Sequence, residues 1–248
     1  VTGAGSGIGR ATALAFSQEG AYLVAVDMDK VGLKETAQLI ADQGGQCETH
    51  VADVSNQLAM TALANKVNAA HGALDVLVNN AGIAPSAPFA RATADAWRAT
   101  MATNLDALFH CCQAALPDLL AAPAGRIVTI ASTAGLKGYG YTAAYVASKH
   151  GAIGLMRALA AEFAATPLTA NALCPGFTDT DIVARAIETI AARTGRSAAE
   201  ALAELTRHNP QKRLITPEEV AAATVWLCLP ASGSVTGQAI PIAGGEVT

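Results

Sequence analysis

Aromatic residues, charged residues and long apolar runs are scarce in this sequence, and each shortage argues against a class of protein. Aromatic residues make up 4% and charged residues 15% of the 248 residues. The net charge is −4 and no run of lysine or arginine occurs, which argues against a nucleic acid or an anionic membrane as partner. No apolar stretch reaches transmembrane length without polar interruption. We expect neither a nucleic-acid nor a membrane partner.

Cysteine is also infrequent. The five cysteines are odd in number and none stands in a CxxC pair; they are Cys47, Cys111, Cys112, Cys174 and Cys228. We interpret them as small buried side chains of a protein from a reducing compartment, with no disulfide and no metal site. The expected location is the cytoplasm.

Strand-like and helix-like segments alternate along the chain. Strands are expected at Tyr22–Asp27, Cys47–Val51, Leu74–Asn79, Arg126–Ala131, Thr169–Cys174 and Ala239–Ile242. Helices are expected at Gly9–Glu19, Val31–Gln43, Gln57–His71, Asp95–Leu116, Ala143–Ala164 and Pro217–Leu227. This alternation predicts an α/β fold, a Rossmann-like, doubly wound parallel sheet of about seven strands in one domain over residues 1–248.

Two regions depart from regular alternation. The chain opens at Val1 directly before a glycine-rich turn, so we expect a truncated first strand. Whether a targeting segment precedes Val1 is left open. Thr178–Gln211 contains two short helical patterns, Thr180–Arg193 and Ala198–Thr206, after a strand end. Because open α/β sheets bind ligands beyond the strand ends, we interpret this segment as a helical lid over a substrate. A simple packing excursion is the alternative.

The glycine-rich turn TGAGSGIG, residues 2–9, indicates a dinucleotide site. Glycine lets the backbone turn tightly and approach a phosphate, and a helix N-terminus then offers free N–H groups to the pyrophosphate. Asp27 ends the next strand, where a carboxylate can bind both ribose hydroxyls and repel a 2′-phosphate. No base stands at Ser6 or Met28, so NAD is favoured over NADP. Asp53 could bind the adenine or merely cap a helix.

Tyr145 and Lys149 stand four residues apart in a helical pattern, which places them on one face. A phenol is a poor base at neutral pH, and we expect the nearby ammonium to lower the pKa of Tyr145. Ser132 closes a strand and can donate to a substrate carbonyl. Asn104 within a helical segment is expected to hold a water that links Lys149 to solvent. Taken singly, each residue is as readily structural as functional.

Together these motifs resemble the short-chain dehydrogenase/reductase family along the whole chain. The set is TGAGSGIG, Asp27, Asp53, NNAG at Asn79–Gly82, Asn104, Ser132, YVASK at Tyr145–Lys149 and PGFTDT at Pro175–Thr180. The resemblance implies catalysis by Ser132, Tyr145 and Lys149 with Asn104 in a proton relay. It also implies a homotetramer that uses the helices Asp95–Leu116 and Ala143–Ala164. The cofactor residues that we expect are Gly3, Ser6, Gly7, Ile8, Gly9, Asp27, Met28, Asp53, Val54, Asn80, Ala81, Gly82, Tyr145, Lys149, Pro175, Gly176, Phe177 and Thr178.

The predicted function is the NAD-dependent interconversion of a secondary alcohol and a ketone. The lid resembles the 3-hydroxybutyrate and 3-hydroxyacyl-CoA dehydrogenase branch, and the aligned substrate positions are Ala84, Ala134, Thr142, His208 and Asn209. Because these positions offer a bare carboxylate no obvious cation, a 3-hydroxyacyl thioester fits better than 3-hydroxybutyrate. Its charged end would lie near one or more basic side chains of this region. The alternative is that these side chains only form solvated helix faces; they are Arg185, Arg193, Arg196, Arg207, Lys212 and Arg213.

Three other functions stay open at this point. They are an NADPH-dependent 3-oxoacyl reductase, a non-catalytic dinucleotide-binding protein, and a sugar-nucleotide epimerase or dehydratase that shares the Tyr-xxx-Lys spacing. The complete Tyr145–Lys149 set argues against the second, and the short chain argues against the third.

Overall fold

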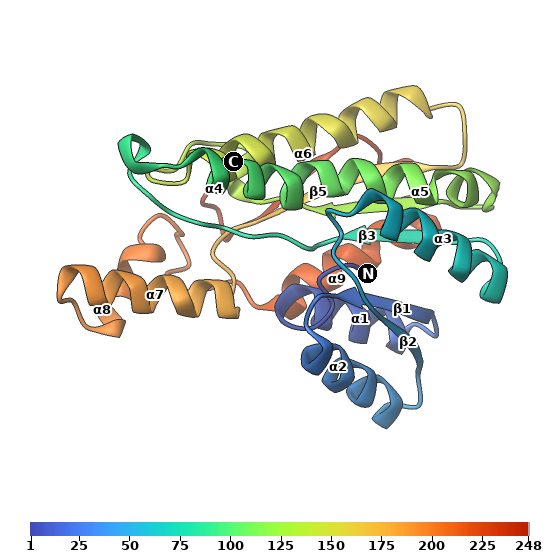
Figure 1. Ribbon diagram of the computed structural model, residues 1–248, viewed down its shortest axis with the longest axis horizontal. Coiled ribbons are helices and arrows are strands. Elements are labelled where there is room, and N and C mark those ends of the chain that lie inside the picture. Colours follow the sequence, from blue (N-terminus) through green and yellow to red (C-terminus); the bar gives the residue numbers. More distant parts are fainter. Residues whose placement is uncertain (248) are drawn as a thin grey trace.

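The computed structural model describes residues 1–247 and shows a parallel sheet covered by helices on both faces (Figure 1). The strands are β1 (Tyr22–Asp27), β2 (Gln46–Val51), β3 (Val76–Asn79), β4 (Arg126–Ile130), β5 (Thr169–Pro175) and β6 (Ala239–Ile242). All strand pairs are parallel, β1 with β2 and then β3, β4, β5 and β6 in that order. The predicted α/β class and parallel sheet are confirmed.

Val1 and Thr2 join the two groups of strands. The Thr2 amide donates to Val78 O (3.0 Å), and the Val26 amide donates to Val1 O (3.0 Å). The order across the molecule is therefore β2, β1, Val1–Thr2, β3, β4, β5, β6. We expected about seven strands. The described residues form six, because Val1–Thr2 make only an isolated bridge to Val26.

Helices cover the sheet in two sets that match its double winding. One face carries α1 (Gly7–Gln18), α2 (Lys30–Asp42) and α9 (Pro217–Cys228), and the other carries α3 (Gln57–His71), α5 (Ala107–Ala121) and α6 (Ala143–Glu162). Each face has its own apolar core, built largely from aliphatic side chains. Strands β4 and β5 are buried along their whole length because both faces are covered, which explains their continuous apolar sequences.

The helix expected at Asp95–Leu116 is longer and less regular than predicted. It begins as α4 (Ala94–Met101), continues through a π-turn at Ala102–Asp106 and ends as α5 at Ala121. Single π-turns inside helices often occur at functional sites. Within residues 1–247, no helix combines the length and the apolarity needed to cross a membrane.

The segment predicted as a lid contains two helices, α7 (Asp181–Thr194) and α8 (Ala198–Leu205), which pack on each other. They project from one end of the sheet, on the left in Figure 1. Gly195 ends α7 in the left-handed conformation with φ 71°, and a capping box of Ser197 and Glu200 starts α8.

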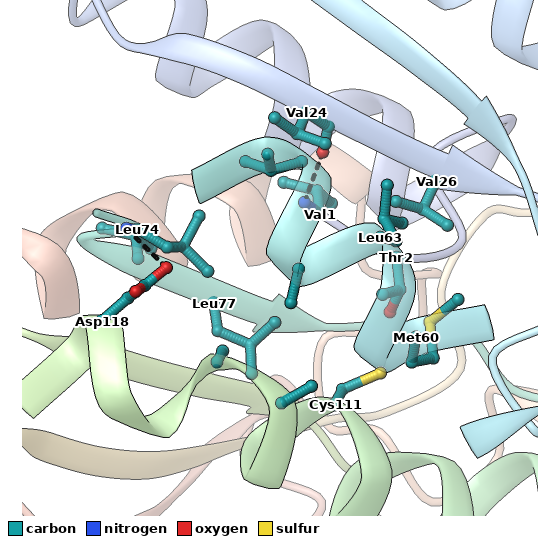
Figure 2. A pocket seen from close by; sticks show the side chains of 15 residues that line it. Val1, Thr2, Val24, Val26, Met60, Leu63, Leu74, Leu77, Cys111 and Asp118 are labelled. Carbon is teal, nitrogen blue, oxygen red and sulfur yellow. Dashed lines mark hydrogen bonds between the residues drawn. The ribbon is translucent and has the colours of Figure 1, made fainter. Parts of the chain in front are cut away.

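An apolar cavity of about 80 Å³ lies beside Val1 (Figure 2). It lies between β1, β3, α3 and α5 and is lined mainly by aliphatic side chains. The Asp118 carboxylate at its edge accepts hydrogen bonds from Asn68 Nδ2 (2.6 Å) and the Leu74 amide (3.3 Å). The cavity therefore offers surface for packing rather than groups for chemistry.

Candidate active site

The glycine-rich turn between Val1–Thr2 and α1 is held by a clamp of side chains. Asn80 Nδ2 donates to the carbonyl oxygens of Thr2 (3.0 Å) and Gly3 (3.1 Å), and Thr2 Oγ1 accepts from the Asn80 and Ala81 amides (3.0 and 3.2 Å). A Cβ on Gly9 would overlap the Gly3 carbonyl, so only glycine fits there. The role of Asn80 seen here is to hold the turn in shape.

The N-terminus of α1 is suited to an anion. The helix begins at Gly7, where φ is 51°, and the Ser6 side chain makes no capping hydrogen bond. The first N–H groups of the helix therefore have no side-chain acceptor at this end. Free N–H groups and the positive end of the helix dipole attract phosphate, so the turn fits the pyrophosphate of a dinucleotide.

Asp27 lies at the end of β1 beside this turn. Its carboxylate accepts hydrogen bonds from the Gly5 amide (2.8 Å) and the Asp29 amide (2.9 Å). The side chain is half-buried, so the charge is oriented but can still reach a ligand. Met28 next to it is 68% exposed and brings no positive charge.

Asp53 is exposed in the turn between β2 and α3. Its Oδ1 accepts from the amide and the hydroxyl of Ser55 (2.9 and 2.7 Å). Helix α3 itself is capped by Asn56, whose Oδ1 accepts from the Ala59 amide at 3.1 Å. Val54 is buried in the core. The observed contacts of Asp53 thus close a turn, and Asn56 performs the capping that we considered for Asp53.

Ser132, Tyr145 and Lys149 come together beyond the end of β4. Ser132 Oγ accepts from the Ala134 amide (3.0 Å), which starts a short 3-10 turn. Lys149 is buried on α6, and its Nζ donates to Ile130 O (2.8 Å) and lies 5.7 Å from the Tyr145 ring centroid. The predicted one-turn spacing therefore places the ammonium beside the phenol.

The charges of this group differ from our sequence-based expectation. Burial raises the pKa of Tyr145, and the hydrogen bond from Ser132 only partly opposes that rise. Burial also lowers the pKa of Lys149 to about 8. Both shifts have one physical cause, since loss of water disfavours phenolate and ammonium alike. In the protein alone, the ammonium does not bring the phenol pKa down.

Asn104 is buried on the π-turn and faces the loop after β3. Its Oδ1 accepts from the Ile83 amide (2.8 Å), and its Nδ2 donates to Ile83 O (2.8 Å) and to Ser148 Oγ (3.2 Å). A Cβ on Gly82 would lie 3.2 Å from Asn104 Oδ1 and 3.7 Å from Lys149 Nζ. Gly82 thus leaves room where the amide and the ammonium converge.

The loop after β5 lies between β6 and the glycine-rich turn. The Gly176 amide donates to Ile242 O (3.0 Å), and Thr178 Oγ1 donates to Gly176 O (3.0 Å). A Cβ on Gly7 would lie 3.0 Å from the Thr180 methyl group. The start of the predicted lid therefore lies against the glycine turn.

The predicted substrate residues do not form one cluster of contacts. Ala134 is buried beside Ser132, and Thr142 Oγ1 donates to Tyr139 O (3.2 Å). Asn209 is buried in its own turn, where Nδ2 donates to Arg213 O (2.9 Å) and Oδ1 accepts from the Gln211 amide (2.8 Å). His208 is exposed and accepts from Arg207, and Ala84 is half-buried after Ile83.

Sequence reasoning missed a polar cluster next to Ser132. The Thr133 hydroxyl, the Tyr139 hydroxyl, the Lys137 ammonium and the Glu246 carboxylate are linked by distances of 2.6 to 3.0 Å. The sequence signal was faint: Lys137 and Tyr139 stand in a glycine-rich loop, and Glu246 follows the glycine pair Gly244–Gly245.

Comparisons with known proteins agree with this geometry. Residues 3–246 match a family model described as enoyl-(acyl carrier protein) reductase. The chain is 36% identical to the 3beta-hydroxysteroid dehydrogenase of Mediterraneibacter gnavus, over 100% of this chain and 94% of that protein. It is 35% identical to the D-beta-hydroxybutyrate dehydrogenase of Cupriavidus necator, over 100% of this chain and 96% of that protein. The solved structure of an actinorhodin polyketide ketoreductase variant with NADPH aligns with a TM-score of 0.95 at 35% identity. The alignment covers 99% of this chain and 95% of the ketoreductase chain.

Proposed function

The chain belongs to the short-chain dehydrogenase/reductase family, whose members interconvert alcohols and ketones, and from this premise we propose NAD-dependent hydride transfer at Ser132, Tyr145 and Lys149. The observation that carries the proposal is the convergence of these three side chains at the end of β4. Gly82 beside Lys149 and Asn80 bonded to Gly3 O connect them to the glycine turn, where a dinucleotide fits.

The three side chains have separate tasks in this proposal. In the oxidative direction, Ser132 donates a hydrogen bond to the substrate oxygen, and Tyr145 takes the hydroxyl proton as the ketone forms. NAD, when bound, would accept the hydride from the carbon that carries this hydroxyl group. Lys149 stabilises the phenolate form of Tyr145 through its ammonium. In the reductive direction, Tyr145 returns the proton to the alkoxide oxygen.

The preference for NAD over NADP rests on this chain's own residues, because the solved relative was determined with NADPH. Two backbone amides orient the Asp27 carboxylate beside the glycine turn. A ribose 2′-hydroxyl can donate to that carboxylate, whereas a 2′-phosphate meets a negative charge. Ser6 and Met28, the neighbouring positions, carry no cation.

We propose a 3-hydroxyacyl thioester as the substrate class. A cavity of about 470 Å³ lies between the segment 87–91 and the end of α7, and it is lined by Ala87, Pro88, Arg91 and Arg193. Two guanidinium groups at this cavity suit the phosphates of a carrier-linked substrate. Of the six bases considered from the sequence, Arg193 is the one that lines this cavity.

Kinetics with 3-hydroxybutyryl-CoA and NAD test the function. Tyr145→Phe should reduce turnover by about 10²- to 10⁴-fold, the usual contribution of a general acid–base, while NADH still binds. Tyr141→Phe is the matched control, because Tyr141 is 71% exposed and loses only the same hydroxyl. Full turnover by Tyr145→Phe would refute the assigned chemistry. Faster 3-oxoacyl reduction with NADPH would favour the reductase alternative, and NADH binding without turnover of any alcohol would favour a binding protein.

We further propose a cytoplasmic homotetramer built from one domain per chain. Five free cysteines support a reducing compartment. Trp97 on α4 and Phe109 on α5 are 43% and 49% exposed, an apolar surface that a second copy would cover. Light scattering coupled to size-exclusion chromatography tests this: a monomer at micromolar concentration would contradict it.

A further inference from the structure

Glu246 places a buried carboxylate near the proposed active site. Its side chain is 2% exposed, and its Oε1 accepts a hydrogen bond from the Tyr139 hydroxyl at 2.6 Å. The Lys137 ammonium lies 3.0 Å from the same oxygen and 5.0 Å from the Tyr139 ring centroid. A buried carboxylate is tolerated when it is paired and hydrogen-bonded, and both conditions are met here.

This cluster lies next to the Ser132 turn. The Tyr139 hydroxyl lies 2.7 Å from Thr133 Oγ1, and Thr133 follows Ser132 directly. On the other side, a Cβ on Gly176 would lie 3.2 Å from Glu246 Oε2. The Tyr139 ring also meets Phe177 edge to face, with centroids 6.1 Å apart. The cluster thus connects the Ser132 turn to the loop after β5.

The electrostatic consequence follows from the pairing. Lys137 is a cation that a substrate carboxylate could use, but its charge is already balanced by Glu246. A free carboxylate beside this cluster would find the Lys137 ammonium already paired with Glu246, so its own charge would stay uncompensated. A neutral ester or thioester would meet only hydrogen-bonding groups.

We propose that Lys137, Tyr139 and Glu246 form a specificity determinant that admits neutral ester or thioester substrates and rejects free 3-oxo and 3-hydroxy acids. This inference rests on the proposed function, because it concerns the substrate of the same site. Glu246 sets the preference by holding Lys137 neutralised, so that a substrate carboxylate finds no free ammonium at this cluster.

The test compares two ketones that differ in charge, acetoacetate and methyl acetoacetate, binding to the NADH complex. The readout is the ratio of their dissociation constants from NADH fluorescence, measured in a Tyr145→Phe background so that the bound ketone is not reduced. Glu246→Gln leaves Lys137 unpaired and should improve relative binding of acetoacetate about tenfold, whereas Lys137→Gln leaves Glu246 unpaired and should weaken it by a similar factor. The double variant restores a neutral pair and should return the ratio to within about threefold of the wild-type value.

Tyr139→Phe is the uncharged control, because it removes the hydroxyl between Thr133 and Glu246 without changing any charge. It should leave the ratio within about threefold of wild type. The inference is overturned if the two charge variants leave the ratio unchanged or move it in the same direction. Because the Lys137 side chain is partly exposed, Lys137→Gln should fold. The binding ratio of that variant still tests the inference even if Glu246→Gln does not fold. Turnover is scored separately: loss of NADH oxidation with both ketones contradicts the proposed function alone.

Discussion

Replacing Asp27 by asparagine should relax the choice between NAD and NADP. The substitution removes one negative charge and keeps the size of the side chain. The carboxylate now accepts from both the Gly5 and the Asp29 amides, and asparagine can accept only one of these bonds without turning its NH₂ group toward a donor. The lost hydrogen bond costs about 0.5–1.5 kcal/mol, which a protein of this size tolerates.

The magnitude follows from Coulomb's law near a protein surface. Two unit charges 4 Å apart interact by about 4 kcal/mol at an effective dielectric constant of about 20. Asp27 is half-buried, so a two- to threefold discount for solvent screening is appropriate and leaves about 1.4–2 kcal/mol. This corresponds to a change of about 10- to 30-fold in the ratio of the two affinities.

The assay is the ratio of kcat/KM for NAD and NADP, supported by dissociation constants of NADH and NADPH. Asp29→Asn is the matched control, since it removes the same charge two residues away while asparagine still caps α2 at the Val31 amide. We expect the control to shift the ratio by less than about threefold. A wild-type enzyme that prefers NADP, or equal shifts in both variants, would refute the reasoning.

Three further predictions concern pH and stability. Because burial lowers the pKa of Lys149 to about 8, the ammonium that stabilises the Tyr145 phenolate should be lost as pH rises through that value, and kcat/KM for alcohol oxidation should fall above about pH 8; a profile that is flat or still rising from about pH 8 to 10 would contradict this. Thr216→Ala removes the acceptor for the Glu219 amide at the start of α9 and should cost about 1 kcal/mol, or about 2–4 °C in melting temperature, with Thr216→Ser close to wild type. Hydrogen bonds from Arg213 hold the pKa of Glu219 at about 2, below its unfolded value of about 4.3, so the stability from this pair is present above pH 4.3 and is lost as pH falls toward 2. In Glu219→Gln, the free energy of unfolding should fall less steeply as pH is lowered from about 4.3 toward 2. The same pH dependence in the variant and the wild type would count against the pairing.

Local patterns were sufficient for most of the fold. The apolar run at Tyr22–Asp27 and the helical pattern at Gln57–His71 form β1 and α3 with the predicted bounds. Such segments are specified by neighbours along the chain, through strand-like apolar runs and helical periodicity. The expected helix Asp95–Leu116 contains a π-turn at its centre, where Asn104 bonds to Ile83 and Ser148, far away in the sequence, and no local pattern predicts that turn.

The sequence by itself determined the α/β class, the glycine turn with Asp27, and the spacing of Tyr145 and Lys149, since each depends on a short stretch of chain. Tertiary structure decided what depends on burial and distant partners. The pKa values of Tyr145 and Lys149 follow from loss of water, which no spacing reveals. Glu246 meets Tyr139 across 107 positions only because the segment after β6 folds back against the loop between β4 and α6. The charge pairing and hydrogen bonding of Lys137, Tyr139 and Glu246 are therefore properties of the folded chain.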